Sequence, residues 1–183
     1  PNAGARMLAG RRTGILALTA PMRPDTYAPA HMAFVLAVSA AARRYDYDIL
    51  LLTADEASGG LSRVGSSSLV DGVVLLDVDE DDERVALVQK LSLPSVAIGL
   101  PADSSNLDCV DLDFEAATDL AISRLQEQGH ESIALIGQAS SVYERGSNFP
   151  ERVRRRFAQT TTERGLSGTF VMPSAVSYTH LTL

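Results

Sequence analysis

Few side chains in this sequence are spaced for catalysis or for metal binding. The three histidines, His31, His130 and His180, lie far apart along the chain. Cys109 is the only cysteine, which excludes an internal disulfide and a cysteine-based zinc cluster. Neither a Gly-x-Ser-x-Gly nucleophile elbow nor a glycine-rich phosphate loop is present. We therefore predict a protein that is not an enzyme and that uses no cofactor and no metal.

An acidic run at residues 77–83 is the one segment that resembles a cation site. It lacks the glycine and the distal glutamate that a calcium loop needs at fixed spacing. We interpret it as a solvated acidic loop that precedes a helix at 82–91.

The loop at residues 21–27 has side chains suited to bind a small polar molecule. It follows a predicted strand at 15–20 and contains Arg23, Asp25 and Tyr27, which offer a charge pair and an aromatic face. Open parallel sheets bind ligands at the carboxyl ends of their strands, so this loop is a candidate binding segment. An ordinary surface loop is the alternative interpretation.

A second group of candidates follows the predicted strand at 132–137. Tyr143 and Arg145 lie in the next loop, and Arg152 begins a basic stretch on the helix that comes after it. These three side chains could bind the same ligand from another part of the fold. The alternative for the basic stretch is a solvated helix face.

Apolar strands alternate with helices along most of the chain. This alternation predicts an α/β fold with a parallel, doubly wound sheet. The predicted strands are 15–20, 48–53, 71–77, 94–99, 109–112 and 132–137, and the predicted helices are 29–44, 82–91, 114–128 and 149–164, with 56–68 a weak helix or a loop.

Two of these helices carry further information. Asp113 is a suitable N-cap for the helix at 114–128, and its buried stripe is expected to consist of Ala117, Leu120, Ala121 and Leu125. The helix at 29–44 is apolar around most of its circumference, which predicts that the sheet covers one side and that a second subunit could cover another.

Charge is distributed unevenly along the sequence. The whole chain has a formal net charge of −7, yet residues 1–12 hold Arg6, Arg11 and Arg12 and no acidic residue. An acidic body argues against general binding to nucleic acid, whereas a basic arm is compatible with local contact to DNA. No apolar run is long enough to span a membrane, and the beginning of the sequence has no signal-peptide pattern.

Several short motifs occur in an order that is informative as a set. Pro-Asn-x-x-Ala-Arg-x-Leu occupies residues 1–8, and Gly129-His130 precedes an apolar strand that ends at Gly137. Between them stand Val-Asp-Gly-Val-Val at 70–74, Leu-Pro-Ser-Val at 93–96 and Val-Asp-Leu-Asp at 110–113. In this order and spacing, the chain resembles the lactose-repressor (LacI/GalR) family of bacterial transcription regulators.

The resemblance implies a division of the chain. Residues 1–12 would be a hinge helix and linker, 13–129 the N-terminal subdomain of a periplasmic-binding-protein-like type I core, and 130–174 the start of a second, truncated subdomain. Residues 175–183 look foreign to this core, and we expect a non-native tail there; a native strand is the alternative.

The resemblance also implies partners. Paired hinge helices of a cytoplasmic homodimer would enter the minor groove of operator DNA, with Leu8 as the wedge between base pairs and Asn2, Ala5 and Arg6 along the groove. A helix-turn-helix domain would precede Pro1, and a small-molecule effector, possibly a sugar, would bind between the subdomains. A periplasmic-type sugar-binding protein and an enzyme on a flavodoxin-like sheet are the competing classes.

Overall fold

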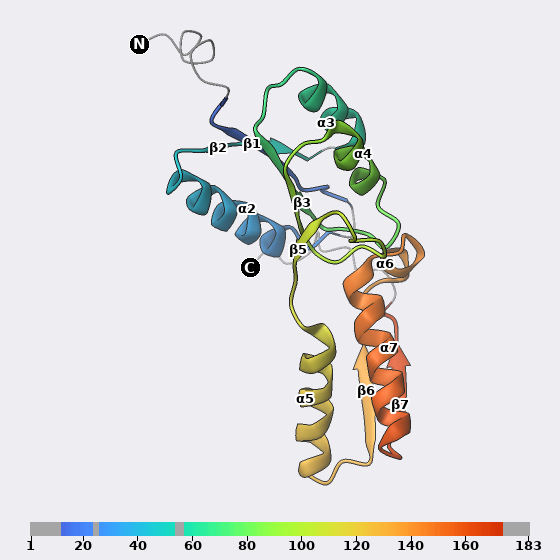
Figure 1. Cartoon of the computed structure of the whole chain (residues 1–183). Helices are drawn as coiled ribbons and strands as arrows, with labels where there is room; N and C mark the ends of the chain where they lie inside the picture. The colour runs from blue at the N-terminus through green and yellow to red at the C-terminus, as the bar shows by residue number, and fades with distance from the viewer. Residues whose placement is uncertain (1–11, 24–25, 54–56, 174–183) are drawn as a thin grey trace. The chain divides into compact units, whose positions relative to one another are not determined.

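The structure of the chain, a computed structural model, describes residues 12–23, 26–53 and 57–173 (Figure 1). The chain divides into two compact units, Pro1–Val110 and Asp111–Leu183, and each is described by itself. Predictions that lie outside the described residues concern Asn2, Ala5, Arg6, Leu8, Asp25 and the tail at 175–183.

The first unit contains a five-stranded sheet in which every neighbouring pair is parallel. The strand order is β2-β1-β3-β4-β5. β3 is buried at every position, which explains its uninterrupted apolar sequence. The strands are β1 (Ile15–Thr19), β2 (Asp48–Leu52), β3 (Gly72–Leu76), β4 (Ser95–Ile98) and β5 (Asp108–Val110).

Helices cover both faces of this sheet (Figure 1). Leu61 of α3 and Val88 of α4 pack with Leu75 in one core cluster, whereas Val35 of α2 packs with Leu18 in another. The segment that we predicted as a weak helix or a loop is a helix. The helices are α2 (Ala28–Arg43), α3 (Ala57–Ser66) and α4 (Glu83–Leu91).

The strand order reverses between β1 and β3. After β1 the chain crosses to β2 on one side, and it then returns to build β3, β4 and β5 on the other side. Such a reversal separates the loops that leave the two central strands and opens a crevice at their carboxyl ends, where open α/β sheets bind ligands. The predicted α/β class with a doubly wound parallel sheet is confirmed.

The second unit is built around a parallel pair of strands with two long helices. Ile122 of α5, Ile133 of β6 and Phe157 of α7 form its buried cluster. Its elements are α5 (Phe114–Glu127), β6 (Ser132–Ile136), α6 (Ser140–Glu144), α7 (Asn148–Glu163) and β7 (Ser167–Val171). The sequence patterns did not predict α6 or β7.

The division between the units lies after Val110, whereas the sequence motifs suggested a boundary after Gly129. The difference concerns α5, which packs along α7 in the second unit. The N-cap of α5 is as predicted, because the side chain of Asp113 accepts a hydrogen bond from the N–H of Ala116. The expected buried stripe is confirmed only at Leu125, which packs against the buried cluster. It is wrong at Ala117, Leu120 and Ala121, which are exposed, and Ile122 is the buried residue of this helix.

Candidate functional site

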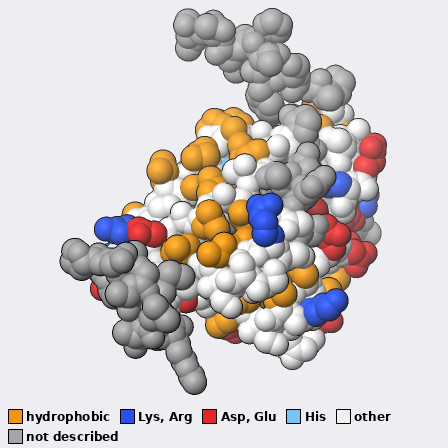
Figure 2. All heavy atoms as spheres, turned by 90° about the horizontal axis from the view of Figure 1, so that it is seen from above, with side chains coloured by type: hydrophobic (Ala, Val, Ile, Leu, Met, Phe, Trp, Pro, Cys, Tyr) orange, Lys and Arg blue, Asp and Glu red, His pale blue; other side chains and the backbone are white. Residues whose placement is uncertain are grey.

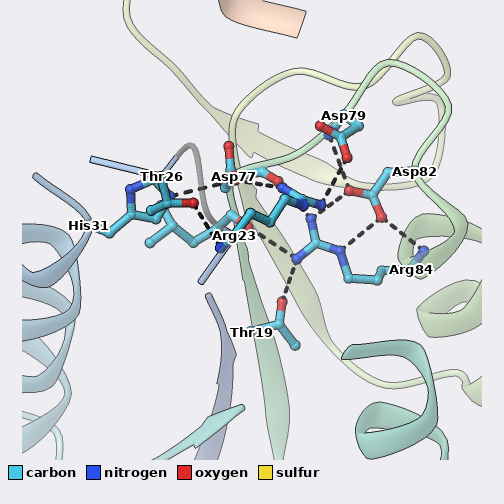
Figure 3. A network of polar contacts seen from close by, with 9 residues as sticks. Thr19, Arg23, Thr26, His31, Asp77, Asp79, Asp82 and Arg84 are labelled. Atoms are coloured by element: carbon cyan, nitrogen blue, oxygen red, sulfur yellow. Dashed lines mark hydrogen bonds and ion pairs between the residues drawn. The ribbon is translucent and has the colours of Figure 1, made fainter. Parts of the chain in front are cut away.

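Arg23 lies at the switch point of the first sheet, just after β1. Its guanidinium donates from Nη1 to Asp77 Oδ2 at 2.7 Å and from Nη2 to Asp79 Oδ2 at 3.0 Å (Figure 3). Both acidic residues come from the loop that follows β3. The side chain of Asp77 is only 6% exposed, and that of Arg23 is 22% exposed. The two central strands therefore deliver a cation and two carboxylates to the same edge of the sheet.

Local backbone structure holds this cluster in place. The N–H of Arg23 donates to Thr26 Oγ1 at 3.0 Å, and the N–H of Thr26 donates back to the carbonyl of Arg23. Asp77 has a φ of 55°, in the left-handed region that acidic residues tolerate better than branched ones. This turn directs the chain away from β3 immediately after the buried strand ends.

His31 approaches the same carboxylate from the first turns of α2. Its Nε2 lies 3.5 Å from Asp77 Oδ2, and its side chain is 19% exposed (Figure 3). A protonated imidazole would place a second cation beside the oxygen that Arg23 already contacts. The cluster thus includes an imidazole nitrogen of His31 close to the carboxylate of Asp77.

Arg84 fixes the loop that carries these acids. It is 3% exposed, and its guanidinium donates to Asp82, to Thr19 Oγ1 and to the carbonyls of Leu76 and Asp77. These contacts use the donor capacity of the guanidinium and connect the ends of β1 and β3 to the start of α4. Arg84 therefore holds the loop after β3 in position, and its guanidinium has no N–H left to donate to a ligand.

Asp82 completes this buried pair. It caps α4 by accepting from the N–H of Arg84, and its side chain is 4% exposed. Burial by itself would raise the pKa of Asp82, but the hydrogen bonds from Arg84 outweigh burial, and the pKa lies below its ordinary value. The carboxylate of Asp82 is therefore ionised at neutral pH.

The remaining candidates in the first unit differ in placement. Tyr27 is the N-cap residue of α2 and is 57% exposed, so much of this residue lies at the surface. The sequence suggested Asp25 as the charge partner of Arg23; among the described residues the partners are Asp77 and Asp79.

Tyr143 in the second unit takes part in packing around the end of β6. Its hydroxyl oxygen accepts a hydrogen bond from the N–H of Gln138 at 3.2 Å, and its ring meets Phe170 edge-on at 5.6 Å. A side chain at Gly137 would collide with both rings, since its Cβ would lie 2.6 Å from the nearest atom of each. Glycine at this position allows the close approach of Tyr143.

Arg145 and Arg152 lie on either side of the start of α7. Arg145 ends α6 and is half-buried. Arg152 donates to both carboxylate oxygens of Glu115 and to Asp111 at 2.5 Å, and its side chain is 14% exposed. Hydrogen bonding with Glu115 raises the pKa of Arg152 above its ordinary value and lowers that of Glu115. Arg152 thus joins α7 to α5.

A known protein family matches most of the chain. Residues 18–172 match the family described as periplasmic binding proteins and sugar binding domain of LacI family. The chain belongs to this family. The match extends through both units and includes all of the elements from β2 to β7.

Two curated relatives of this LacI-type chain are named as transcriptional regulators. The chain is 28% identical over 144 residues to the HTH-type transcriptional regulator RafR of Escherichia coli, covering 77% of this chain and 43% of that protein. It is 30% identical over 145 residues to the HTH-type transcriptional regulator CelR of Thermobifida fusca, covering 74% of this chain and 42% of that protein. The chain spans less than half the length of these relatives.

Solved structures share the fold of the LacI-type chain. A LacI family transcriptional regulator from Bifidobacterium animalis subsp. lactis has a TM-score of 0.74 at 22% identity, covering 90% of this chain and 58% of that one. A complex of the transcriptional regulator CelR with cellobiose has a TM-score of 0.66 at 21% identity, covering 90% of this chain and 53% of that one.

In residues 12–23, 26–53 and 57–173, no cluster of three or more His, Cys, Asp or Glu side chains has a metal-binding arrangement. Over the same ranges, no helix has both the length and the hydropathy needed to cross a bilayer.

Sequence reasoning missed Arg84 and the pairing of Arg23 with Asp79. The motif Asp-x-Arg at 82–84 is short and resembles an ordinary charged helix start. The only available signal was a basic residue in the first turn of a helix, where acidic residues are favoured by the helix dipole. An arginine there requires a specific partner, which Asp82 provides.

Proposed function

We propose that the chain is the effector-binding core of a DNA-binding transcription regulator whose operator affinity is controlled by a small molecule. The observation that carries the proposal is the cluster of Arg23, Asp77 and Asp79 at the switch point of a sheet that belongs to this family. The names of the curated relatives support the regulatory role.

The effector that suits the cluster in the first unit is a neutral polyhydroxylated molecule. Arg23 is already neutralised by Asp77 and Asp79, and the Arg84–Asp82 pair adds no net charge. Carboxylate oxygens accept hydrogen bonds from sugar hydroxyls, whereas an anionic ligand would meet a local excess of negative charge. The solved relative CelR in complex with cellobiose supports a sugar as the ligand class.

We propose that side chains from both units contact the effector. Arg23, Asp25 and Tyr27 would contribute from the first unit. Tyr143, Arg145 and Arg152 would contribute from the second unit. Among the described candidates Tyr27 is the most exposed, and Arg152 would have to share its guanidinium with Glu115 and Asp111.

DNA contact is assigned to the basic arm at residues 1–12. Asn2, Ala5 and Arg6 would follow the minor groove and Leu8 would insert between base pairs, next to a helix-turn-helix domain of the whole protein. The effector would change operator affinity through its different affinities for two arrangements of the core.

A homodimer is proposed from the outer face of α2. Met32, Phe34 and Leu36 are 40%, 44% and 66% exposed, although all three are large and apolar. Leu50 and Leu51 of the edge strand β2 are also exposed, and Figure 2 shows hydrophobic side chains gathered over part of the surface seen from above. Exposed large apolar side chains in such numbers are typical of an interface.

The test uses the full-length protein from which the chain derives. Operator binding is measured by gel shift, with and without cellobiose and a panel of neutral saccharides. We expect the Leu8→Ala variant to lose operator affinity and bending while its circular dichroism stays unchanged. A protein that binds saccharide but no DNA in any state would contradict the proposal and favour a sugar-binding protein of a transport system.

A further inference from the structure

A single carboxylate holds the chain at the point where it enters the first sheet. Asp71, in the loop before β3, accepts from the N–H of Thr13 at 2.7 Å and from the N–H of Gly14 at 2.9 Å. The Thr13 hydroxyl donates to the same carboxylate at 3.0 Å. These contacts join residues 57 and 58 positions apart in the sequence, so they are tertiary contacts. We call Thr13, Gly14 and Asp71 the entry clamp.

The backbone around the entry clamp fixes the direction of the chain. The N–H of Asp71 donates to the carbonyl of Ile15 at 2.8 Å, and the N–H of Ile15 donates to the Thr13 hydroxyl at 3.2 Å. Gly14 has a φ of 72°, a conformation that glycine adopts without strain. Its carbonyl accepts from the N–H of Asp48, the first residue of β2, at 2.9 Å. The segment before β1 is therefore attached at the starts of both neighbouring strands.

The charge of Asp71 strengthens the entry clamp. Burial by itself would raise the pKa of Asp71, but the hydrogen bonds from Thr13 and Gly14, together with the charge of Arg12, outweigh burial and lower this pKa. The carboxylate is therefore ionised at neutral pH. Hydrogen bonds to an ionised acceptor are stronger than those between neutral groups, so the contacts to Asp71 are expected to be firm.

The entry clamp and the Arg23 cluster lie at opposite ends of the same two strands. β1 and β3 are parallel, with Leu16 beside Gly72 and Thr19 beside Leu75. The entry clamp precedes both strands, whereas the Arg23 cluster follows them. In the sequence, residues 1–11 come directly before Arg12 and Thr13. The basic arm is thus joined to the core at the entry clamp, away from the edge that carries the cluster.

We infer that Asp71 is a positioning residue for DNA binding, which fixes the point and the direction at which the basic arm leaves the core. The inference rests on the proposed function, in which the arm contacts operator DNA. Holding a binding segment in place before the complex forms raises affinity, because less conformational freedom is lost on binding. Asp71 therefore supports operator affinity from within the core, and the motif Val-Asp-Gly-Val-Val at 70–74 gains a role beyond starting a strand.

Limited digestion of the chain with trypsin tests the entry clamp without DNA. Cleavage after Arg12 requires Thr13 and Gly14 to leave the clamp and enter the protease. In Asp71→Asn one acceptor oxygen becomes an amide that cannot accept, so the fragment that begins at Thr13 should form about tenfold faster, as measured by mass spectrometry. Equal rates in the parent chain and in Asp71→Asn would overturn the inference.

Asp103→Asn is the matched control for this substitution. Asp103, in the loop between β4 and β5, also accepts from a backbone N–H and a hydroxyl, both of Ser105. The same charge is removed, but the loop is far from the arm in sequence. Cleavage after Arg12 should therefore keep the parent rate in Asp103→Asn, and equal acceleration in both variants would overturn the inference.

Duplex affinity tests the consequence in the full-length protein. The probe is a labelled duplex that the parent protein selects from a random DNA pool, and fluorescence anisotropy is recorded at a temperature where circular dichroism shows each variant folded. We expect Asp71→Asn to weaken binding by about tenfold and Thr13→Val by about threefold. Thr13→Ser keeps the hydroxyl, so this variant and Asp103→Asn should bind like the parent. If Asp71→Asn does not fold, Thr13→Val and Thr13→Ser carry the comparison.

The outcomes separate the inference from the proposed function. Equal duplex affinity in the parent and in the variants of Asp71 and Thr13 would overturn the inference and leave the proposed function intact. A loss of affinity in Asp103→Asn as large as in Asp71→Asn would also overturn it, since the effect would then come from charge alone. A parent protein that selects no duplex would contradict both.

Discussion

The two units of this chain hold their elements together in different ways. In the first unit β3 is buried at every residue, and core clusters lie on both faces of the sheet. In the second unit the cluster is small, and a row of arginines on α7 pairs with acidic residues on α5. The first unit is therefore stabilised mainly by apolar burial, and the second depends more on exposed and half-buried ion pairs.

This contrast has a consequence for how each unit responds to its surroundings. Apolar burial depends little on salt, whereas ion pairs near the surface are weakened by screening. We therefore expect the free energy of unfolding of the second unit to depend on salt concentration and pH more strongly than that of the first.

The largest expected effect comes from truncating the core of the first unit. Leu75 is 0% exposed, so Leu75→Ala should lower the free energy of unfolding by about 2–5 kcal/mol through lost burial and a residual cavity. Urea denaturation followed by circular dichroism measures this change. Leu120→Ala in the second unit, at a residue that is 71% exposed, is the control and should change stability by less than about 0.5 kcal/mol. If both substitutions lowered the free energy of unfolding equally, apolar burial in the first unit would not be its main source of stability.

The buried ion pair of the first unit should come next. Arg84→Met removes the cation and leaves Asp82 buried without its partner, which should cost about 3–5 kcal/mol at neutral pH. Because the pKa of Asp82 is lowered in the folded chain, the pair stabilises the fold above the ordinary carboxyl range and this contribution is lost as pH falls through the folded pKa. The penalty of Arg84→Met should therefore shrink in acid, as urea titrations at several pH values would reveal.

A second change identifies the cause of that penalty. Asp82→Asn combined with Arg84→Met removes both charges, and it should recover part of the stability lost in the single variant. If the double variant is as unstable as the sum of the two single changes, the pair is not coupled and the interpretation of Arg84 is wrong.

A smaller effect is expected at the junction of α5 and α7. Arg152→Gln breaks the contacts to Glu115 and Asp111 and should cost about 1 kcal/mol at low salt, discounted because the Glu115 side chain is 39% exposed. The pKa of Glu115 is lowered, so this contribution is present above its ordinary value and lost as pH falls through the folded pKa. Denaturation at low salt and at 1 M sodium chloride should show a difference between parent and variant that disappears at high salt.

The smallest effect is expected from an ion pair on the surface of the first unit. Arg43 contacts Asp48 at 2.6 Å, but the two side chains are 69% and 71% exposed. Arg43→Ala should leave the urea midpoint unchanged at either salt concentration, because water already solvates both charges. A salt-dependent loss comparable to that of Arg152→Gln would show that ion pairs support both units alike.

The fold was predictable where the pattern is local. The continuous apolar run of β3 and the Asp113 cap of α5 were both read correctly from neighbouring residues. The buried face of α5 was not, because Leu120 and Ile122 are both large and apolar, and only Ile122 is buried. The acidic residues of α5 point toward α7, since arginines there meet them, and a single helix carries no sign of its partner's charges.

The candidate site shows the same limit. Arg23 was a candidate from its place after β1, and the structure gives it carboxylate partners more than fifty residues away in sequence. Spacing cannot reveal such a pairing without the strand order that brings β1 beside β3.

The spacing of charges between α5 and α7 has one more consequence. Glu115 and Asp119 are four residues apart, and so are their partners Arg152 and Arg156. Sliding one helix along the other by a single turn would align either Glu115 with Arg156 or Asp119 with Arg152, so one of these two ion pairs would re-form with the wrong partner and the other would be lost. Charge therefore separates the two registers by only one ion pair, and the packing of Phe157 with Ile122 adds the shape that holds α5 and α7 in the observed register.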